Sequence, residues 1–396
     1  MVNKHRTSFV ATACASLMVA SAVPALGAFD AADPDPLRQG QLVRLADLAT
    51  TQNARELPTV AVGWRTGSSP GKLFMSFSTD GGATYLRGNG KLRQWAVAGF
   101  GNRGLSLDVC GNNVWAGSAA NFPGDRRRDT DVLITRRAVG GRAAQVFVTA
   151  PSVRRTVRDV SISCVGSKLL AIAWLEKSDG KTRARLMLRD LDSIAPAATS
   201  KSYFLGRAIF GAGISVASTA RSVHVAWTSG TARNVRYRRF IVGNQANPKV
   251  SPKSIVTLAN GQANKPQLAI QGNKVVAAYT DSGKVVLRLS QDLGATFEAP
   301  QTLIGAGSPQ QPSRVHSADT FGDRVVIEAT RNVSGTTTAQ RHESTDLGGA
   351  WDVQSFGHNG PRMGALRKSG PGTSSLAEAW LDNGATDTLR AQYETP

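Results

Sequence analysis

Alternating apolar and polar residues recur in short runs from about residue 40 to the end of the chain. The most regular run usually ends in an aromatic residue, and its seven copies are "TVAVGW" (Trp64), "NNVWAG" (Trp115), "LLAIAW" (Trp174), "SVHVAW" (Trp227), "KVVAAY" (Tyr279), "RVVIEA" (Ala329, with no aromatic) and "SLAEAW" (Trp380). A second alternating run precedes most copies, a third follows each copy, and a fourth often comes next. A period of two residues between joins of Gly, Asn, Asp and Ser predicts short β-strands.

The repeat predicts the architecture. Four short antiparallel strands in each unit of about fifty residues are typical of a β-propeller blade. Seven copies of the second strand predict seven blades in one all-β domain, residues 41–396, with six blades as the alternative count. The last unit stops after its third strand, so we expect residues 41–49 to pair with residues 388–394 and close the ring.

One turn occurs three times with the template S-x-D-x-G-x-T-aromatic. The copies are Ser78, Asp80, Gly82, Thr84 and Tyr85; Ser290, Asp292, Gly294, Thr296 and Phe297; and Ser344, Asp346, Gly348 and Trp351, where Ala350 replaces the Thr. In each copy the Asp can accept backbone N–H groups across the turn, and the Gly permits a positive φ. The pattern contains no nucleophile or acid pair, so we interpret it as a structural turn between the third and fourth strands.

These three motifs resemble the Asp boxes, or BNR repeats, of the sialidase superfamily, which lie at this turn of a propeller blade. The superfamily includes sialidases, other glycosidases and binding propellers without catalysis. Sialidases resemble one another in an Arg-Ile-Pro-type motif, further arginines that hold a carboxylate, an Asp acid, and a Tyr nucleophile paired with Glu. No Arg-Ile-Pro occurs here, and each of the five Tyr has a plainer place in a strand or turn, so a true sialidase is disfavoured.

The opposite face of the propeller carries the starts of the inner strands and the turns between second and third strands; we call it the loop face. Four arginines fall at or beside the starts of inner strands, where they can converge on the axis as ligand-binding residues: Arg103, Arg158, Arg314 and Arg362. Guanidinium groups suit a carboxylate or a sulfate. The alternative interpretation is that they are solvated loop residues.

Acidic residues on the same face are candidates for catalysis, because a glycosidase needs two carboxyl groups about 5–10 Å apart. The candidates are Asp129, Asp159, Glu176 and Glu328. They equally fit a polar rim around a binding site, and no spacing pairs one acid with another. The five His are scattered and show no metal-ligand spacing, so we expect neither a metal nor a cofactor.

The N-terminus resembles an export signal. Residues 1–28 combine early basic residues with a short apolar run that ends in small residues, which predicts a signal peptide cut near Ala28, followed by a linker over residues 29–40. No later segment is apolar enough to span a membrane. After removal of Cys14 with the signal, Cys110 and Cys164 remain at the far ends of consecutive inner strands, and in an oxidising compartment we expect them to form a disulfide.

The charge favours anionic partners. Net charge is +19, and +17 (45 − 28) without the signal peptide, although a general excess of Arg explains it equally well. No basic run with interleaved aromatics indicates specific nucleic-acid binding. The sequence therefore predicts a secreted, monomeric propeller that recognises extracellular acidic glycans or anionic polymers through its loop face. The alternative is an exo-acting glycoside hydrolase that uses loop-face carboxylates and the arginine cluster.

Overall fold

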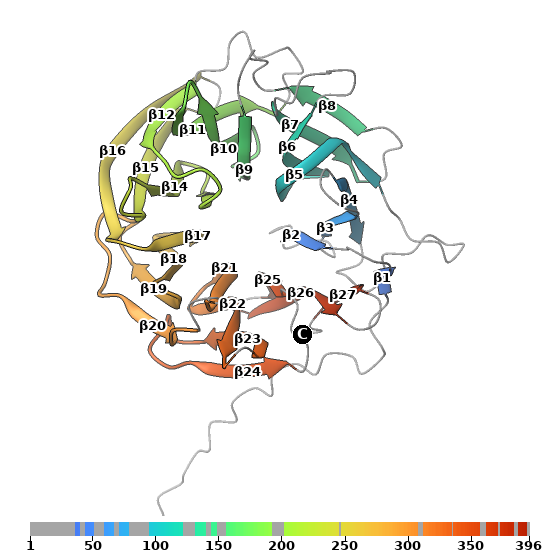
Figure 1. The fold of residues 1–396 in the computed structure, drawn as a ribbon. Coiled ribbons are helices and arrows are strands. Elements are labelled where there is room, and N and C mark those ends of the chain that lie inside the picture. The colour runs from blue at the N-terminus through green and yellow to red at the C-terminus, as the bar shows by residue number, and fades with distance from the viewer. Residues whose placement is uncertain are drawn as a thin grey trace, which may run out of the picture.

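The computed structural model describes residues 36–39, 44–50, 59–66, 71–78, 95–121, 131–139, 144–148, 156–191, 202–244, 247–307, 312–334, 336–356, 362–370, 373–383 and 387–393. The predicted signal peptide, Asp129 and all of the first Asp box except Ser78 lie outside these ranges. Every regular element within them is a β-strand, numbered β1 to β27. The strands are arranged in sheets around a central axis (Figure 1).

Five of the six sheets have four antiparallel strands. Four of them follow the order of the chain, and the first three of these are β9 (Thr156–Val165), β10 (Leu169–Ser178), β11 (Lys181–Asp190) and β12 (Ser202–Arg207); β13 (Ile214–Ser218), β14 (Ser222–Ser229), β15 (Asn234–Asn244) and β16 (Asn247–Ala259); β17 (Ala263–Gln271), β18 (Lys274–Asp281), β19 (Lys284–Ser290) and β20 (Gln301–Ile304). We number these blades 3, 4 and 5. Blade 6 is β21 (Arg314–Phe321), β22 (Arg324–Val333), β23 (Thr336–Ser344) and β24 (Asp352–Phe356). Blade 7 is β25 (Arg362–Gly370), β26 (Thr373–Asn383), β27 (Asp387–Tyr393) and β1 (Pro36–Gln39).

The sixth sheet has seven strands: β2 (Arg44–Thr50), β3 (Val60–Thr66), β4 (Gly71–Ser78), β5 (Trp95–Cys110), β6 (Asn113–Asn121), β7 (Asp131–Ala138) and β8 (Ala144–Val148). The long strand β5 serves two units. Its first part pairs with β4, and after register shifts between Gly101 and Leu105 its second part pairs only with β6. β5 is thus the outer strand of blade 1 and the inner strand of blade 2. The described residues form six sheets, with a seventh four-stranded unit inside the largest, and the predicted four-stranded propeller blades are confirmed.

The ring closes through a different strand from the one expected. Residues 41–49 were expected to pair with β27, but β2 pairs with β3 and is the inner strand of blade 1. The four-residue strand β1 pairs with β27 instead, with Gln39 opposite Thr388. The physical reason is burial: Leu48 packs with Trp64 of blade 1 and Ala377 of blade 7, and an outer strand would have left this apolar side chain at the rim.

Hydrophobic clusters lie between successive blades. The described aromatic residues that end second strands are buried there, and Trp64, Trp174, Trp227 and Tyr279 are each at most 1% exposed. One cluster joins Leu175 and Leu186 of blade 3 to Val225 and Trp227 of blade 4. The recurring aromatic residue of the sequence therefore marks the contact between neighbouring blades.

Polar side chains on the inner strands hydrogen-bond to the next inner strand. Ser106 Oγ accepts the N–H of Ile162 at 3.2 Å, and Ser161 Oγ accepts that of Val216 at 3.0 Å. The same contact recurs from Ser317 to the N–H of Gly364 at 3.0 Å. These bonds satisfy backbone groups that face the axis and hold neighbouring inner strands in register.

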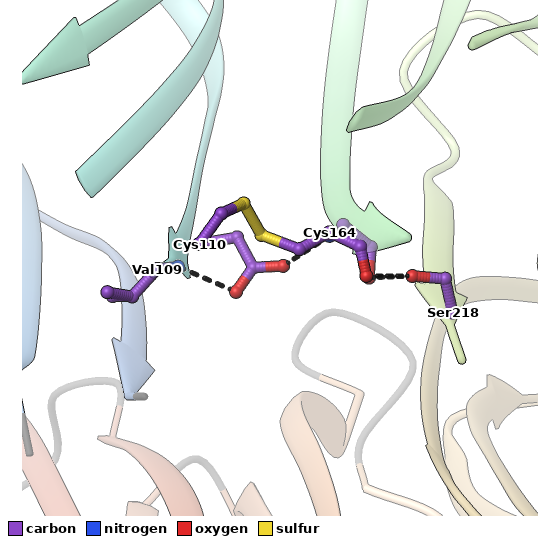
Figure 2. The surroundings of a disulfide bond; sticks show 6 residues. Val109, Cys110, Cys164 and Ser218 are labelled. Atoms are coloured by element: carbon purple, nitrogen blue, oxygen red, sulfur yellow. Dashed lines mark hydrogen bonds between the residues drawn. A yellow bond between two sulfur atoms is a disulfide. The ribbon is translucent and has the colours of Figure 1, made fainter. Parts of the chain in front are cut away.

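The predicted disulfide lies at the far end of two inner strands (Figure 2). Cys110 of β5 and Cys164 of β9 are bonded, with a Cα–Cα distance of 5.8 Å. Beside them, Asp108 accepts N–H groups from Val109 and Cys164, both at 2.7 Å, and Ser218 Oγ donates to the Cys164 carbonyl at 2.6 Å. The disulfide therefore joins blades 2 and 3, and hydrogen bonds extend the connection to blade 4.

Candidate functional site

The inner strands of all seven units enclose one axial cavity of about 220 Å³. Its lining includes Leu48 of β2, Asp108 of β5, Ser161 of β9, Ser215 of β13, Gln267 of β17, His316 and Asp319 of β21, and Gly364 of β25. The lining is rich in hydroxyl, amide and carboxyl groups because alternate residues of each inner strand point toward the axis. A polar cavity on the axis can take a ligand through hydrogen bonds.

Two cations and a histidine lie together where this cavity meets the loop face; we call them the mouth: Lys265, Arg314 and His316. Lys265 and Arg314 are exposed, and Lys265 sits in a bulge of β17 with φ +54°. Burial, and then the nearby charges of Arg314 and Lys265, lower the pKa of His316 to about 4. His316 is therefore neutral at pH 7, and its Nε2 lies 3.1 Å from Thr330 Oγ1.

The mouth carries net positive charge. Within the described ranges neither Lys265 nor Arg314 forms an ion pair with a carboxylate. Sequence reasoning missed Lys265 and His316, because the comparison of inner-strand starts considered arginines. The signal available was a lysine at the start of the inner strand "NKPQLAIQ".

The four predicted arginines have different surroundings. Arg314 is at the mouth, and Arg158 is half-buried with its guanidinium 4.5 Å from the ring centre of Phe210. Arg362 is only 2% exposed and binds carboxylates between blades. The side chain of Arg103 lies outside the described residues. The described part of the chain thus leaves Arg314 as the fully exposed member of the predicted set.

Arg362 belongs to a buried cluster of four charged residues, which we call the blade 6–7 cluster: Glu328 of β22, Arg341 of β23, Arg362 of β25 and Glu378 of β26. Arg341 Nη1 lies 3.0 Å from Glu378 Oε1, and Arg362 donates to both Glu378 oxygens, from Nε at 3.1 Å and from Nη2. Arg362 Nε lies 3.7 Å from Glu328 Oε1. Both glutamates are 0% exposed.

The pKa values of the two glutamates are displaced in opposite directions. Burial, and then the adjacent Glu378 carboxylate, raise the pKa of Glu328 well above its usual range. Burial acts on Glu378 in the same direction, but the Arg362 and Arg341 guanidiniums outweigh it and hold its pKa below the ordinary value. These opposite shifts favour the protonated form at Glu328 and the ionised form at Glu378.

The position of the cluster limits what it can do. The Phe356 ring covers Arg362, with its centre 3.7 Å from the guanidinium carbon, and no member is open to solvent. Sequence reasoning named Glu328 and Arg362 and missed Arg341 and Glu378. The signal available for Glu378 was an acid inside the second strand "SLAEAW", as Glu328 lies inside the second strand "RVVIEA".

The remaining candidate acids do not join this cluster. Glu176 is 2% exposed and is held by Arg185 Nε at 2.9 Å and Trp174 Nε1 at 3.2 Å. Asp159 has φ +51° beside a bulge of β9, and Asp129 lies outside the described ranges. Among the described candidates, Glu176 therefore pairs with Arg185, whereas Glu328 lies beside Arg362 in the blade 6–7 cluster.

The two described Asp boxes follow β19 and β23, on the face opposite the mouth. Asp292 Oδ1 accepts from Ser290 Oγ at 2.8 Å and from the Thr296 N–H at 2.9 Å, and Oδ2 accepts from Thr296 Oγ1 at 2.7 Å. Hydrogen bonds from the Thr296 backbone and side chain and from Ser290 lower the pKa of Asp292 to about 2. All of these partners belong to the turn itself, which is what a structural role requires.

The potential for metal binding is small in the described part of the chain. The one group of three suitable side chains there is Asp108, Cys110 and Cys164, and the disulfide removes both sulfurs as ligands. Among these residues no helix is long and apolar enough to span a membrane.

No family model matches this chain, and no curated protein matches its sequence. Among solved structures, a mutant of Trypanosoma rangeli sialidase displaying trans-sialidase activity is similar at a TM-score of 0.46 and 12% identity, covering 78% of this chain and 56% of that one. Hadza microbial sialidase Hz136 is similar at a TM-score of 0.47 and 10% identity, covering 82% of this chain and 74% of that one. One chain from a study of two prolyl endopeptidases is similar at a TM-score of 0.49 and 14% identity, covering 90% of this chain and 47% of that one.

This chain thus spans about half the length of the Trypanosoma rangeli sialidase and of the prolyl endopeptidase. Because every one of these TM-scores is below 0.5, the assignment of the fold rests on strand pairing within this chain. That pairing defines a β-propeller. Solved sialidases are among the structures to which this chain is similar.

Proposed function

We propose that this protein is an exported propeller that binds acidic glycans, or other carboxylated or sulfated polymers, at its mouth. The observation that carries the proposal is the pair of exposed cations, Lys265 and Arg314, which no described carboxylate neutralises and which lie beside the polar axial cavity. An anionic group of the ligand would bind the two cations, and ring hydroxyls would hydrogen-bond to cavity groups such as Gln267.

Binding of an acidic oligosaccharide, measured by calorimetry, tests this proposal. We expect Lys265→Ala with Arg314→Ala to weaken binding by about 10-fold or more, because each partly desolvated charge-assisted bond contributes roughly 1.5–3 kcal/mol. Lys168→Ala is the matched control, since Lys168 is an exposed cation at the opposite end of an inner strand. Equal affinity of the double variant and the control would place the ligand elsewhere.

A glycoside hydrolase is the second candidate, favoured by one observation. In the blade 6–7 cluster, Glu328 and Glu378 lie together with pKa values displaced in opposite directions, which is the pattern of an acid and its ionised partner. Complete burial argues against substrate access, so we prefer binding. Hydrolysis of a panel of aryl glycosides that includes a sialoside, abolished by Glu328→Gln at an unchanged melting temperature, would establish the enzyme instead.

A further inference from the structure

One segment of the chain carries cations and no acids. Residues 193–280 contain eleven Lys and Arg and no Asp or Glu, although the whole chain has 28 acidic residues. This segment contributes +11 of the formal net charge of +19. It comprises the outer strand β12 of blade 3, all of blade 4, and most of the two innermost strands of blade 5.

The outer part of blade 4 concentrates this charge. Arg236 and Arg238 are two residues apart on β15 and therefore point to the same face. Their partners on the outer strand β16 are Thr257 and Ile255. Lys253 lies on the same strand, two residues before Ile255. Lys253 is exposed and Ile255 is 44% exposed. We call Arg236, Arg238, Lys253 and Ile255 the blade-4 rim.

The rim cations have neutral partners. Arg236 Nη1 donates to Thr257 Oγ1, and Arg238 Nε donates to the Lys253 carbonyl at 2.8 Å. No described carboxylate pairs with either arginine or with Lys253. A guanidinium has five N–H donors, so each arginine keeps several for a ligand.

Arginines in other blades are arranged differently. Arg185 pairs with Glu176, Arg324 pairs with Glu343 at 2.8 Å, and Arg362 pairs with Glu378. Blade 4 contains no Asp or Glu, so it supplies no such partner to the rim cations.

Protection of a sheet edge explains part of the pattern but not all of it. Lysine and proline on an outer strand discourage pairing with another chain, and Pro252 and Lys253 on β16 fit that role. Arg236 and Arg238 lie on β15, which is paired on both sides, where no edge needs protection. Edge protection also gives no reason for a long segment without acids.

Aromatic and aliphatic groups lie among the cations. Phe240 packs 5.4 Å from the Arg238 guanidinium and 5.9 Å from the ring of Tyr203 on blade 3. Ile255 offers exposed apolar surface on the same side of the sheet. Phe240 is only 1% exposed, so the accessible apolar surface is that of Ile255. A sugar ring can place its C–H face on Ile255 while its acidic substituents reach the cations, whereas the phosphodiester backbone of a nucleic acid presents mainly charged oxygens.

We propose that the blade-4 rim binds side-on along a linear carboxylated or sulfated polysaccharide, as a second site separate from the mouth. Several moderate charge contacts in a row give an affinity that depends steeply on salt, because binding releases the counterions of the polymer. This proposal does not depend on the mouth, since an internal stretch of the polymer suffices.

Dextran sulfate, with neutral dextran as its matched reference, is the probe. The test variant is Arg236→Gln with Lys253→Gln, and the control is Lys181→Gln with Arg331→Gln, two exposed cations outside the acid-free segment. We expect the rim variant to bind about 10-fold more weakly near 50 mM salt and the slope of log K against log salt to shrink by about two, with at most a twofold loss in the control.

Further variants separate the possible outcomes. Ile255→Glu should also weaken binding, because it puts a charge of the same sign as the polymer on the rim. The rim substitutions should weaken dextran sulfate binding by the same factor when Lys265→Ala and Arg314→Ala are also present, because the two sites are separate. Equal losses in the rim and control variants would overturn the proposal in favour of net charge alone. Tighter binding of duplex DNA with the same dependence on the rim would overturn the assignment to a polysaccharide. Unchanged melting temperatures establish that each variant is folded.

Discussion

Asp108 and Asp319 lie on the inner strands β5 and β21 and make the same two backbone hydrogen bonds. Each Oδ1 accepts the N–H of the next residue in its own strand, Val109 at 2.7 Å and Thr320 at 2.8 Å. Each Oδ2 accepts an N–H of the following inner strand, from Cys164 and from Leu366, both at 2.7 Å. Burial raises the pKa of Asp108 to about 6 and that of Asp319 to about 7, against the effect of these bonds.

The first prediction concerns Asp319→Asn. A folded-state pKa of about 7 lies above the ordinary value of 3.8, so between these values the folded state holds a proton that the unfolded state has lost. The stabilisation is complete below about pH 4 and is lost as the pH rises through 7. We expect the difference in free energy of unfolding, wild type minus variant, to fall by a few kcal/mol at most between pH 4 and pH 8. Urea denaturation at each pH measures it, and a constant difference would contradict the shift.

The second prediction concerns the stability of the whole protein, which we expect to depend on pH in the opposite sense to the contribution of Asp319. Burial lowers the pKa of His224 to about 3 and those of His316 and His342 to about 4, so these side chains stay neutral in the folded state while unfolded His takes up a proton near pH 6.5. Stability is then lost as the pH falls from 6.5 toward 4. Asp108, Asp319 and Glu328, whose pKa values are raised, oppose this loss. We expect the effect of the histidines to be the larger one, so that the wild-type melting temperature falls in this range; a rise would show that the carboxyl groups dominate.

The third prediction concerns the disulfide. Cys110 and Cys164 are separated by 54 residues, and on the chain-entropy model such a bond stabilises by roughly 4 kcal/mol. The variant Cys110→Ser with Cys164→Ser should lose about this much stability in chemical denaturation. Mass measurement after alkylation without reductant should show neither cysteine modified. Two alkylated cysteines would show that the folded protein keeps free thiols.

The fourth prediction compares the two described Asp boxes. Thr296 donates to Asp292 through both its backbone N–H and its hydroxyl, whereas Ala350 gives Asp346 only a backbone N–H, at 2.9 Å. We expect Asp292→Ala to lower the melting temperature more than Asp346→Ala, and Ala350→Thr to raise it slightly by supplying the missing hydroxyl. Thermal melts measure all three. Affinity for the glycan should not change, because these turns lie on the face opposite the mouth, and a loss of binding at constant melting temperature would place function on the Asp-box face.

The sequence predicted the repeat because its strands follow a strict rule. An aromatic residue that ends a second strand is buried between blades, as Trp174 and Trp227 show, so its position in the sequence reports a position in space. The rule failed at the ring closure, where β2 lacks an aromatic residue and β1 has only four residues. The place of β2 as an inner strand depends on burial of Leu48 against blade 7. That contact joins the two ends of the chain, so no local pattern contains it.

The candidate site was less predictable because charge alone does not determine exposure. Arg314 and Arg362 both begin inner strands, yet one is exposed at the mouth and the other is buried. The difference arises from Glu378 and Arg341, which come from other strands and form the partners of Arg362. Long-range pairing of this kind cannot be found from the spacing of one residue type.

The last prediction separates the roles of the two glutamates of the blade 6–7 cluster. Glu378 is the ionised partner of both Arg341 and Arg362, so Glu378→Gln leaves two buried guanidiniums without a counter-charge and should cost roughly 3–5 kcal/mol. Burial and Glu378 raise the pKa of Glu328 and so favour its protonated form, and Gln is close in shape to a protonated glutamic acid. We therefore expect Glu328→Gln to change the free energy of unfolding by less than about 1 kcal/mol, since both partners keep their charges. Chemical denaturation at pH 7 compares the two variants in the same buffer. Equal large losses would mean that Glu328 is ionised and that the cluster is a neutral set of two arginines and two carboxylates.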